Sequence, residues 1–531
     1  MNQSCIFLPN SITYANYGAL SFIEARDYRV KARHVVGKLS SATRSREISH
    51  GYRINSSIST SYYGVEDGDE QETMWSQLKK IIAFAGPATA LGLCGPLMSL
   101  IDTAVIGQGS SIELAALGPG TVICDYIGYL FAFLPIASSN LVATSLAKKD
   151  KTEVQHHISM LVSVGIACGL LLLLLTRIFG SQALIAFAGR NNQDLVASAN
   201  TYVQIRSLAW PIIFVGWVAQ SASLGMRDSW GPLKALVAAT IVNGIGDAIF
   251  CLLFKFGIAG AAWATMASQV VSSFMMIENL KRKGYKPFQF SAPTASESLT
   301  MAGLAAPVLL MMTSKVAFWT LMTYFATALG PIPVAAHQVM LQTFSMCAVW
   351  GTPISQTAQS FLPEYIYGDN RNLLKAKNLL KSLLTIGGLL GLALSAAEIL
   401  VTLLFPTIFT HDQAIITKMH RVVVPSFVAV LVAPCSQCLE GTLLAVRDLK
   451  FLNLSLIACF ALGALALLVR AVLYSLFFRS FSRCSYQLGR WKGYGLVGIW
   501  FALVVFQLAR FALFSHRLFS SGSKLSEGNS S

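Results

Sequence analysis

Long apolar runs constrain this chain more than any other feature. Predominantly apolar runs of 18 or more residues recur from about residue 80 to about residue 515. Each can cross the roughly 30 Å hydrocarbon core of a bilayer as a helix. A transmembrane barrel would instead show segments of about ten residues with alternating polarity, and the chain does not show them. The sequence therefore predicts an all-α polytopic membrane protein.

Twelve transmembrane helices can be placed along this region. The predicted spans are residues 79–106, 113–146, 157–179, 199–224, 231–254, 258–280, 300–328, 333–360, 376–407, 418–445, 451–477 and 494–515. They divide the chain into a leader (1–73), an N-terminal six-helix lobe (74–280), a charged linker (281–299), a C-terminal six-helix lobe (300–515) and a polar tail (516–531).

An internal repeat relates the two lobes. At an offset of 220 residues, Arg227-Asp228 aligns with Arg447-Asp448. Further along, residues 257–264 align with 495–502 at an offset of 238, and the difference of 18 fits an insertion around 478–492. Two repeated halves with a site between them are typical of alternating-access transporters.

The basic residues predict the orientation of the chain. Fifteen Lys and Arg lie in or beside the connections after even-numbered spans, whereas the other side is poorer apart from the loop 478–492. Both termini should therefore face the positive side. The net charge of +15 is scattered through these loops and forms no stripe on a soluble fold, so a nucleic-acid partner is not expected.

The leader has the composition of an organelle transit peptide. Up to Ser61 it holds eleven Ser and eight Lys or Arg against three acids, with no long apolar stretch. The abundance of Ser favours a plastid over a mitochondrion, and a disordered cytosolic tail is the alternative. In the plastid inner envelope membrane, the positive side would be the stroma.

Polar residues inside the apolar spans are the first functional candidates. Asp102 lies in the first span, and Asn243 and Asp247 lie four residues apart in the fifth, on one helix face. An acid at mid-bilayer costs roughly 2.5–3.5 kcal/mol on insertion scales, so it calls for a function. We interpret the three as one proton-titrating cluster, since charging two neighbouring carboxylates in a dry site is unfavourable. The alternative is that each acid caps a helix or makes a structural hydrogen bond.

Four further polar residues are candidates for lining a substrate cavity. Lys315 in the seventh span would suit an anionic aromatic substrate, although it could instead pair with an acid or extend to the interface. His337 opens the eighth span, and an interfacial histidine is the alternative that its position favours, while Asp125 and Glu440 are acids deep in the second and tenth spans.

Several short motifs, in this order and spacing, resemble the multidrug and toxic compound extrusion (MATE) family of antiporters. The resemblance covers about residues 78–515. The matching motifs are at 101–107, 113–118, 202–206, 225–228, 231–232, 243–247, 257–265 and 335–338. In the DinF-like branch of that family, matching positions form the proton site, which adds Thr265 to Asp102, Asn243 and Asp247. With its leader, the chain looks most like the plastid-targeted plant DETOXIFICATION branch, which includes a salicylate exporter of the chloroplast envelope.

The resemblance implies a monomeric transporter and not an enzyme. It implies export of a small organic solute, such as an aromatic acid, in exchange for protons, with no cofactor and with Na⁺ open as the other coupling ion. Many family members carry an acid in the seventh helix, where the repeat places Met322 here, so a cation site in the C-terminal lobe is not expected.

Two other function classes compete with this interpretation. A membrane-embedded transferase would show Asp-rich or His-rich motifs for diphosphate and metal, and the chain has none. A lipid flippase with the same two lobes stays open on sequence alone.

The leader hypothesis predicts organelle import. A fusion of residues 1–75 to a fluorescent reporter should accumulate in plastids of transfected leaf cells, as seen by overlap with chlorophyll fluorescence. A diffuse cytosolic signal would refute the hypothesis, and a fusion that begins at residue 76 is the control.

Overall fold

The computed structural model describes residues 74–147, 150–189, 192–226, 228–367, 372–480 and 494–520. Within these ranges the chain is helical and contains no strand. The predicted leader 1–73 lies outside the described residues. The fold class predicted from the apolar runs is confirmed.

The helices follow the twelve predicted spans in order. The N-terminal lobe contains α2 (Met74–Gly109), α3 (Ser111–Thr121), η1 (Val122–Tyr126), η2 (Ile127–Phe131), α4 (Phe133–Ala147), α5 (Lys151–Ala188), α6 (Gln193–Ser207), α7 (Trp210–Gly225), α8 (Trp230–Asp247), η3 (Ala248–Leu253) and α9 (Gly257–Arg282). The C-terminal lobe contains α10 (Ala295–Ala328), α11 (Pro331–Ala348), η4 (Val349–Gly351), α12 (Thr352–Tyr367), α13 (Leu373–Leu404), η5 (Pro406–Ile408), α14 (Gln413–Ala445), α15 (Leu449–Ser480) and α17 (Tyr494–Phe519). Eight described helices are long and apolar enough to cross a membrane, and the bent pair α6–α7 makes a ninth.

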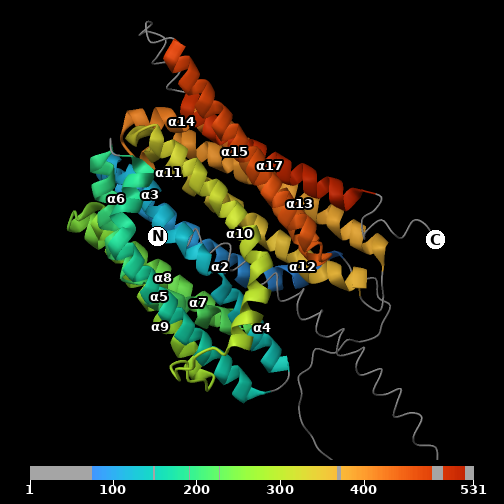
Figure 1. Cartoon of the computed structure of the whole chain (residues 1–531). Helices are drawn as coiled ribbons and strands as arrows, with labels where there is room; N and C mark the ends of the chain where they lie inside the picture. The colour runs from blue at the N-terminus through green and yellow to red at the C-terminus, as the bar shows by residue number, and fades with distance from the viewer. Residues whose placement is uncertain are drawn as a thin grey trace, which may run out of the picture.

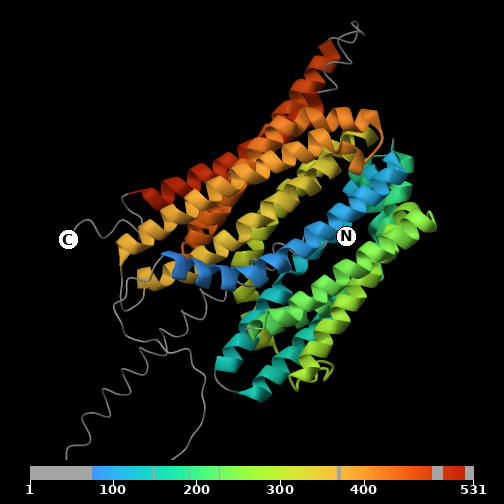
Figure 2. The same cartoon turned by 180° about the vertical axis from the view of Figure 1, so that it is seen from behind.

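Helix α2 lies between the two lobes. Figures 1 and 2 show it, in blue, between the green N-terminal helices and the yellow to red C-terminal helices. It packs against α8 on the N-terminal side and against α11 and α12 on the C-terminal side. A movement of α2 relative to one lobe would therefore also change its contacts with the other lobe.

The second and fourth spans are broken. Between α3 and α4 the chain passes through a π-helical and a 3₁₀ segment, η1 and η2. The axes of α6 and α7 differ by 57°. Pro211 stands in the first turn of α7, where a missing backbone N–H costs little because that turn has no helical acceptor for it. Such departures from α-geometry often mark functional regions in helices.

Hydrophobic packing joins the lobes at one end of the molecule. There, Leu114 and Leu117 of α3 share a buried cluster with Val334 and Val339 of α11. Toward the other end each lobe has its own buried cluster. The cluster of the N-terminal lobe includes one buried residue of the C-terminal lobe, Met301, and the cluster of the C-terminal lobe includes one of the N-terminal lobe, Ile136. The lobes are therefore held together mainly at the end where α2 passes into α3.

Polar contacts close the same end. The Gln108 Nε2 at the end of α2 donates to the carbonyl oxygens of Thr407 at 2.7 Å and Ile408 at 2.8 Å. The Ser111 hydroxyl donates to Asp412 Oδ2 at 2.7 Å, and Asp412 also caps α14. These loops follow odd-numbered spans, so the closed end is opposite the positively charged connections.

The repeat is visible in equivalent contacts. In the N-terminal lobe, Asp228 accepts hydrogen bonds from Asn279 at 2.9 Å and pairs with Lys283 at 2.6 Å. In the C-terminal lobe, Asp448 pairs at 2.8 Å with Arg517, which aligns with Asn279 at the offset of 238. Burial raises the pKa of Asp228, but the hydrogen bonds from Lys283 and Asn279 outweigh it, and the net pKa is lowered. Each acid thus ties the start of its lobe's fifth helix to the sixth.

Residues 283–294 connect the last helix of the N-terminal lobe to the first of the C-terminal lobe, within the predicted linker 281–299. Helix α9 ends at Arg282, and α10 begins at Ala295 after a capping box in which Thr294 and Glu297 bond reciprocally. Hydrogen bonds from the Thr294 side chain and backbone, together with His156, lower the pKa of Glu297 to about 2. At the other end of the C-terminal lobe, α17 continues to Phe519, into the predicted polar tail.

Close helix contact at Gly169 yields a stability prediction. A methyl group at this position on α5 would lie 2.4 Å from the Cα of Pro211 on α7, so Gly169→Val should overpack the contact. The expected cost is about 1–3 kcal/mol, seen as a lower melting temperature in detergent. Gly244→Val is the matched control, because nothing lies within 4 Å of a methyl group there. Equal melting temperatures for the two variants would contradict the packing.

Candidate functional site

An amide in the N-terminal lobe joins two carboxyl groups. The Asn243 Nδ2 donates to Asp102 Oδ1 at 3.1 Å and to Asp247 Oδ2 at 3.2 Å. The Thr265 hydroxyl lies 3.2 Å from Asp102 Oδ2 and donates at 2.8 Å to the carbonyl oxygen of Ala261. The four predicted coupling residues come from α2, α8 and α9, and none has exposed surface. The structure brings them together, while their role in proton coupling stays a prediction.

Helical spacing on α8 positions this cluster. Asn243 and Asp247 are four residues apart and point into the lobe, whereas Ile241 and Ile245 are 57% and 56% exposed on the outer face. The α-helix ends at Asp247, where the π-helical segment η3 begins. Asn243 Oδ1 and Asp247 Oδ1 have no hydrogen-bond partner among the described residues. The cluster therefore has spare capacity to accept a proton or a hydrogen bond.

The equivalent positions of the C-terminal lobe are apolar. The repeat aligns Asp102, Asn243, Asp247 and Thr265 with positions that carry no charge or amide, namely Met322, Gly463, Leu467 and Leu503. The three side chains are buried, and a methyl group at Gly463 would lie 2.4 Å from the ring of Phe318. That this lobe lacks a matching cation site stays a prediction from the sequence.

Asp125, a cavity candidate, is paired inside the N-terminal lobe. The Arg206 Nη1 lies 3.1 Å from Asp125 Oδ1 and donates at 3.1 Å to the Tyr202 hydroxyl. Asp125 and Arg206 are only 5% and 6% exposed. The pair joins η1, which forms part of the break in the second span, to the end of α6, which precedes the break in the fourth span. We expect the pair to stabilise the geometry of both breaks.

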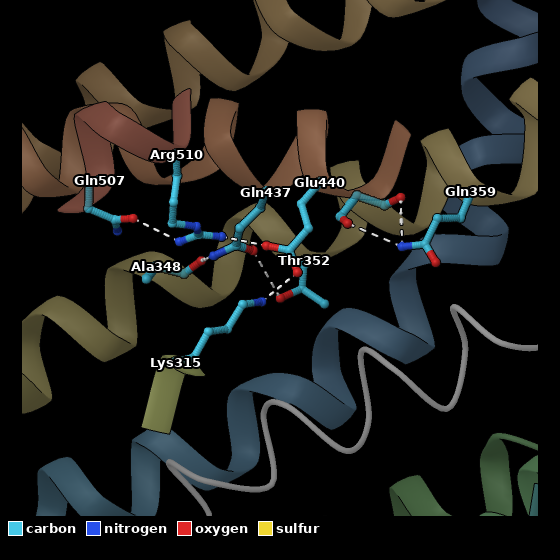
Figure 3. Close-up of polar contacts among 9 residues, drawn as sticks. Lys315, Ala348, Thr352, Gln359, Gln437, Glu440, Gln507 and Arg510 are labelled. Carbon is cyan, nitrogen blue, oxygen red and sulfur yellow. Dashed lines mark hydrogen bonds and ion pairs between the residues drawn. The ribbon is translucent and has the colours of Figure 1, made fainter. Parts of the chain in front are cut away.

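Lys315 and Glu440, two further candidates, belong to one ion cluster. The Lys315 Nζ donates to Glu440 Oε1, and the Arg510 Nη2 donates to Glu440 Oε2. Figure 3 shows the three side chains pointing toward one another from α10, α14 and α17. Lys315 is thus paired with an acid, which was one of the alternatives for it.

His337 is buried inside the protein. Its ring centroid is 5.9 Å from that of Trp500, and its Nε2 lies 3.5 Å from the Thr323 hydroxyl. No surface of the side chain is exposed, so it contacts protein on all sides. His337 Nδ1 has no partner among the described residues, and the residue remains a candidate.

Comparison with known protein families resolves the identity of this architecture. A family model described as MatE matches residues 87–249 and again residues 307–469. The two matched segments are offset by 220 residues, the offset of the internal repeat. The chain belongs to the MatE family. As a MatE protein it is a membrane transporter and not an enzyme.

Similar proteins agree with this assignment. The chain is 54% identical to "Protein DETOXIFICATION 47, chloroplastic" of Arabidopsis thaliana, over 86% of this chain and 81% of that protein. It is 26% identical to "Protein DETOXIFICATION 44, chloroplastic" of the same plant, over 83% and 82% of the two chains. A solved MATE transporter described as being in an inward-facing conformation matches with a TM-score of 0.69 at 20% identity, over 82% of this chain and 96% of that one.

Sequence reasoning missed the roles of two arginines in this MatE protein. Arg206 lies in the family motif at residues 202–206, and Arg510 lies inside the last predicted span. The signal was present, because a cation inside a membrane span has to find a partner. The partners, Asp125 and Glu440, are distant in sequence, so only the folded chain could identify them.

The Arg206–Asp125 pair yields a stability prediction. Asp125→Ala leaves a buried guanidinium without its carboxylate, which should cost about 3–5 kcal/mol. The double variant Asp125→Leu/Arg206→Met removes both charges and should recover most of that loss. Thermal unfolding in detergent measures both. A double variant no more stable than Asp125→Ala would show that the pair is not what fixes this region.

Proposed function

We propose that the chain is a proton-coupled antiporter that exports a small organic anion, an aromatic acid such as salicylate, across the plastid inner envelope membrane. The observation that carries this proposal is the buried bridge from Asn243 to the carboxyl groups of Asp102 and Asp247. Two carboxyl groups held by one amide form a site whose charge changes when one proton binds. The plastid location is supported by the chloroplastic relative at 54% identity and by the composition of the leader.

Helix α2 would transmit protonation between the lobes. Asp102 lies on α2, so a proton that enters or leaves the cluster alters how this helix binds to α8. The same helix packs on α11 and α12 and ends at Gln108, which bonds to the C-terminal lobe. Pro96 removes a backbone hydrogen bond and gives α2 a place to bend. Protonation would thereby favour one arrangement of the lobes and substrate the other.

The lobes in this structure would correspond to the state open toward the stroma. Their shared core and the contacts of Gln108 and Ser111 close the end opposite the basic connections. The positive-inside rule assigns those connections to the stromal side. The neighbour with a TM-score of 0.69 is described as inward-facing, which agrees with this assignment. We propose that the protein functions as a monomer, with its substrate bound between the lobes.

Transport by purified protein tests the function. In proteoliposomes, an imposed pH gradient should drive accumulation of radiolabelled salicylate, and a protonophore should abolish it. A parallel imposed Na⁺ gradient at equal pH should drive none. Salicylate flux that is insensitive to the pH gradient would contradict proton coupling, and absence of flux for salicylate and other aromatic acids would contradict the substrate class.

The coupling residues make a sharper prediction. Asp102→Asn and Asp247→Asn should each abolish flux driven by the pH gradient, because an amide cannot exchange a proton in this range. Amounts in the membrane should match wild type, since Asn fills a similar volume. Asp194→Asn, on the exposed first turn of α6, is the control and should transport normally. Wild-type flux by the double variant would remove the cluster from the mechanism.

A further inference from the structure

The ion cluster of the C-terminal lobe has more positive than negative groups. Lys315 and Arg510 share the two oxygens of Glu440, one each. The three side chains are 7–8% exposed. Glu398, another buried acid of the lobe, instead accepts a hydrogen bond from Ser426 at 2.6 Å. Among the described residues, the ion pairs of both cations go to Glu440 alone, so the ionised cluster carries one unmatched positive charge.

The repeat does not require these charges. At the offsets of 220 and 238 residues, Lys315, Glu440 and Arg510 align with uncharged residues of the N-terminal lobe, Gly95, Gln220 and Ser272. All three counterparts are buried. The same packing is therefore achieved in the other lobe without an ion. A buried charge costs free energy unless a partner of opposite sign is present, so an excess cation here calls for an anion.

The guanidinium of Arg510 has an edge that Glu440 fills only in part, at Nη2. Its Nη1 donates to Gln507 Oε1 at 2.8 Å, and its Nη2 donates to Glu440, whereas its Nε is buried without a partner among the described residues. The Nε–Nη2 edge presents two parallel N–H groups whose spacing matches the two oxygens of a carboxylate. A second carboxylate could occupy this edge.

Aromatic rings border the same guanidinium. Its central carbon lies 5.6 Å from the ring centroid of Phe506 and 6.0 Å from that of Phe514. Phe506 in turn stacks on Phe318 of α10, with ring centroids 4.2 Å apart. A cation beside aromatic surface suits a ligand that has both a carboxylate and an aromatic ring.

We propose that Lys315 and Arg510 form the binding site for the carboxylate of the transported anion, and that Glu440 is an internal counter-ion which that carboxylate displaces. The choice of an aromatic monocarboxylate as ligand rests on the proposed function. In the empty state Glu440 holds the two cations together. When substrate binds, its carboxylate takes the Nε–Nη2 edge of Arg510 and the ammonium of Lys315, and Glu440 turns away. Arg510 and Glu440 thereby become specificity-determining residues.

Equilibrium binding to the full-length protein in detergent tests the proposal. Salicylate and its neutral analogue salicylamide are titrated by calorimetry, with no gradient present. Arg510→Gln and Lys315→Met should each weaken salicylate binding about tenfold or more, the size of one charge-assisted hydrogen bond, and leave salicylamide unchanged. Glu440→Gln removes the competing carboxylate and should tighten salicylate binding by about tenfold.

Control variants keep the result interpretable. Glu398→Gln removes a buried acid of the same lobe outside the cluster and should leave both titrations unchanged. If Glu440→Gln does not fold, Lys315→Met/Glu440→Gln keeps the net charge of the cluster at +1. This double variant should bind salicylate more tightly than Lys315→Met alone.

The outcomes separate this site from the proposed function. Salicylate binding with the expected pattern but without proton-driven flux would retain the site and reject the coupling. Glu440→Gln that binds salicylate no more tightly than wild type would overturn the counter-ion role. Equal losses for salicylate and salicylamide in Arg510→Gln would show that the cluster holds the fold together and does not select a carboxylate.

Discussion

The cost of a charge inside a membrane protein governs how this chain is built. Buried ionisable groups are stable only with partners, and in three places the described residues bring such groups together. Asp102 and Asp247 share one amide from Asn243. Arg206 and Asp125 form a one-to-one pair. Lys315 and Arg510 share a single carboxylate. Only the one-to-one pair is balanced in charge, and we assign it a structural role.

The other two clusters are unbalanced in opposite directions, and each lies in a different lobe. The N-terminal cluster has an excess of acid, which a proton can relieve. The C-terminal cluster has an excess of cation, which an organic anion can relieve. At the positions equivalent to each cluster, the other lobe is apolar or neutral, as Met322 and Gln220 illustrate. The repeat thus supplies two copies of one scaffold, and in our proposals each copy carries a different ligand chemistry.

In the proposed mechanism, communication between the lobes depends on α2. It carries Asp102 in its membrane-spanning part and Gln108 at its end, and it packs on helices of both lobes. The hydrophobic core is shared at that end and divided at the other. A close-packed core resists gradual deformation, so a change of partner for Asp102 is expected to move whole lobes and not single side chains.

The sequence by itself determined the helical class, the order of the spans, the repeat and the shared helix face of Asn243 and Asp247. Span length is fixed by bilayer thickness, and helical periodicity places Asn243 and Asp247 on one face. Only the tertiary structure decided which charged side chains pair with one another. Glu440 lies 125 residues from Lys315 and 70 from Arg510, and Asp125 lies 81 from Arg206. Local propensity carries no information on such pairs, because they depend on how helices distant in sequence pack side by side.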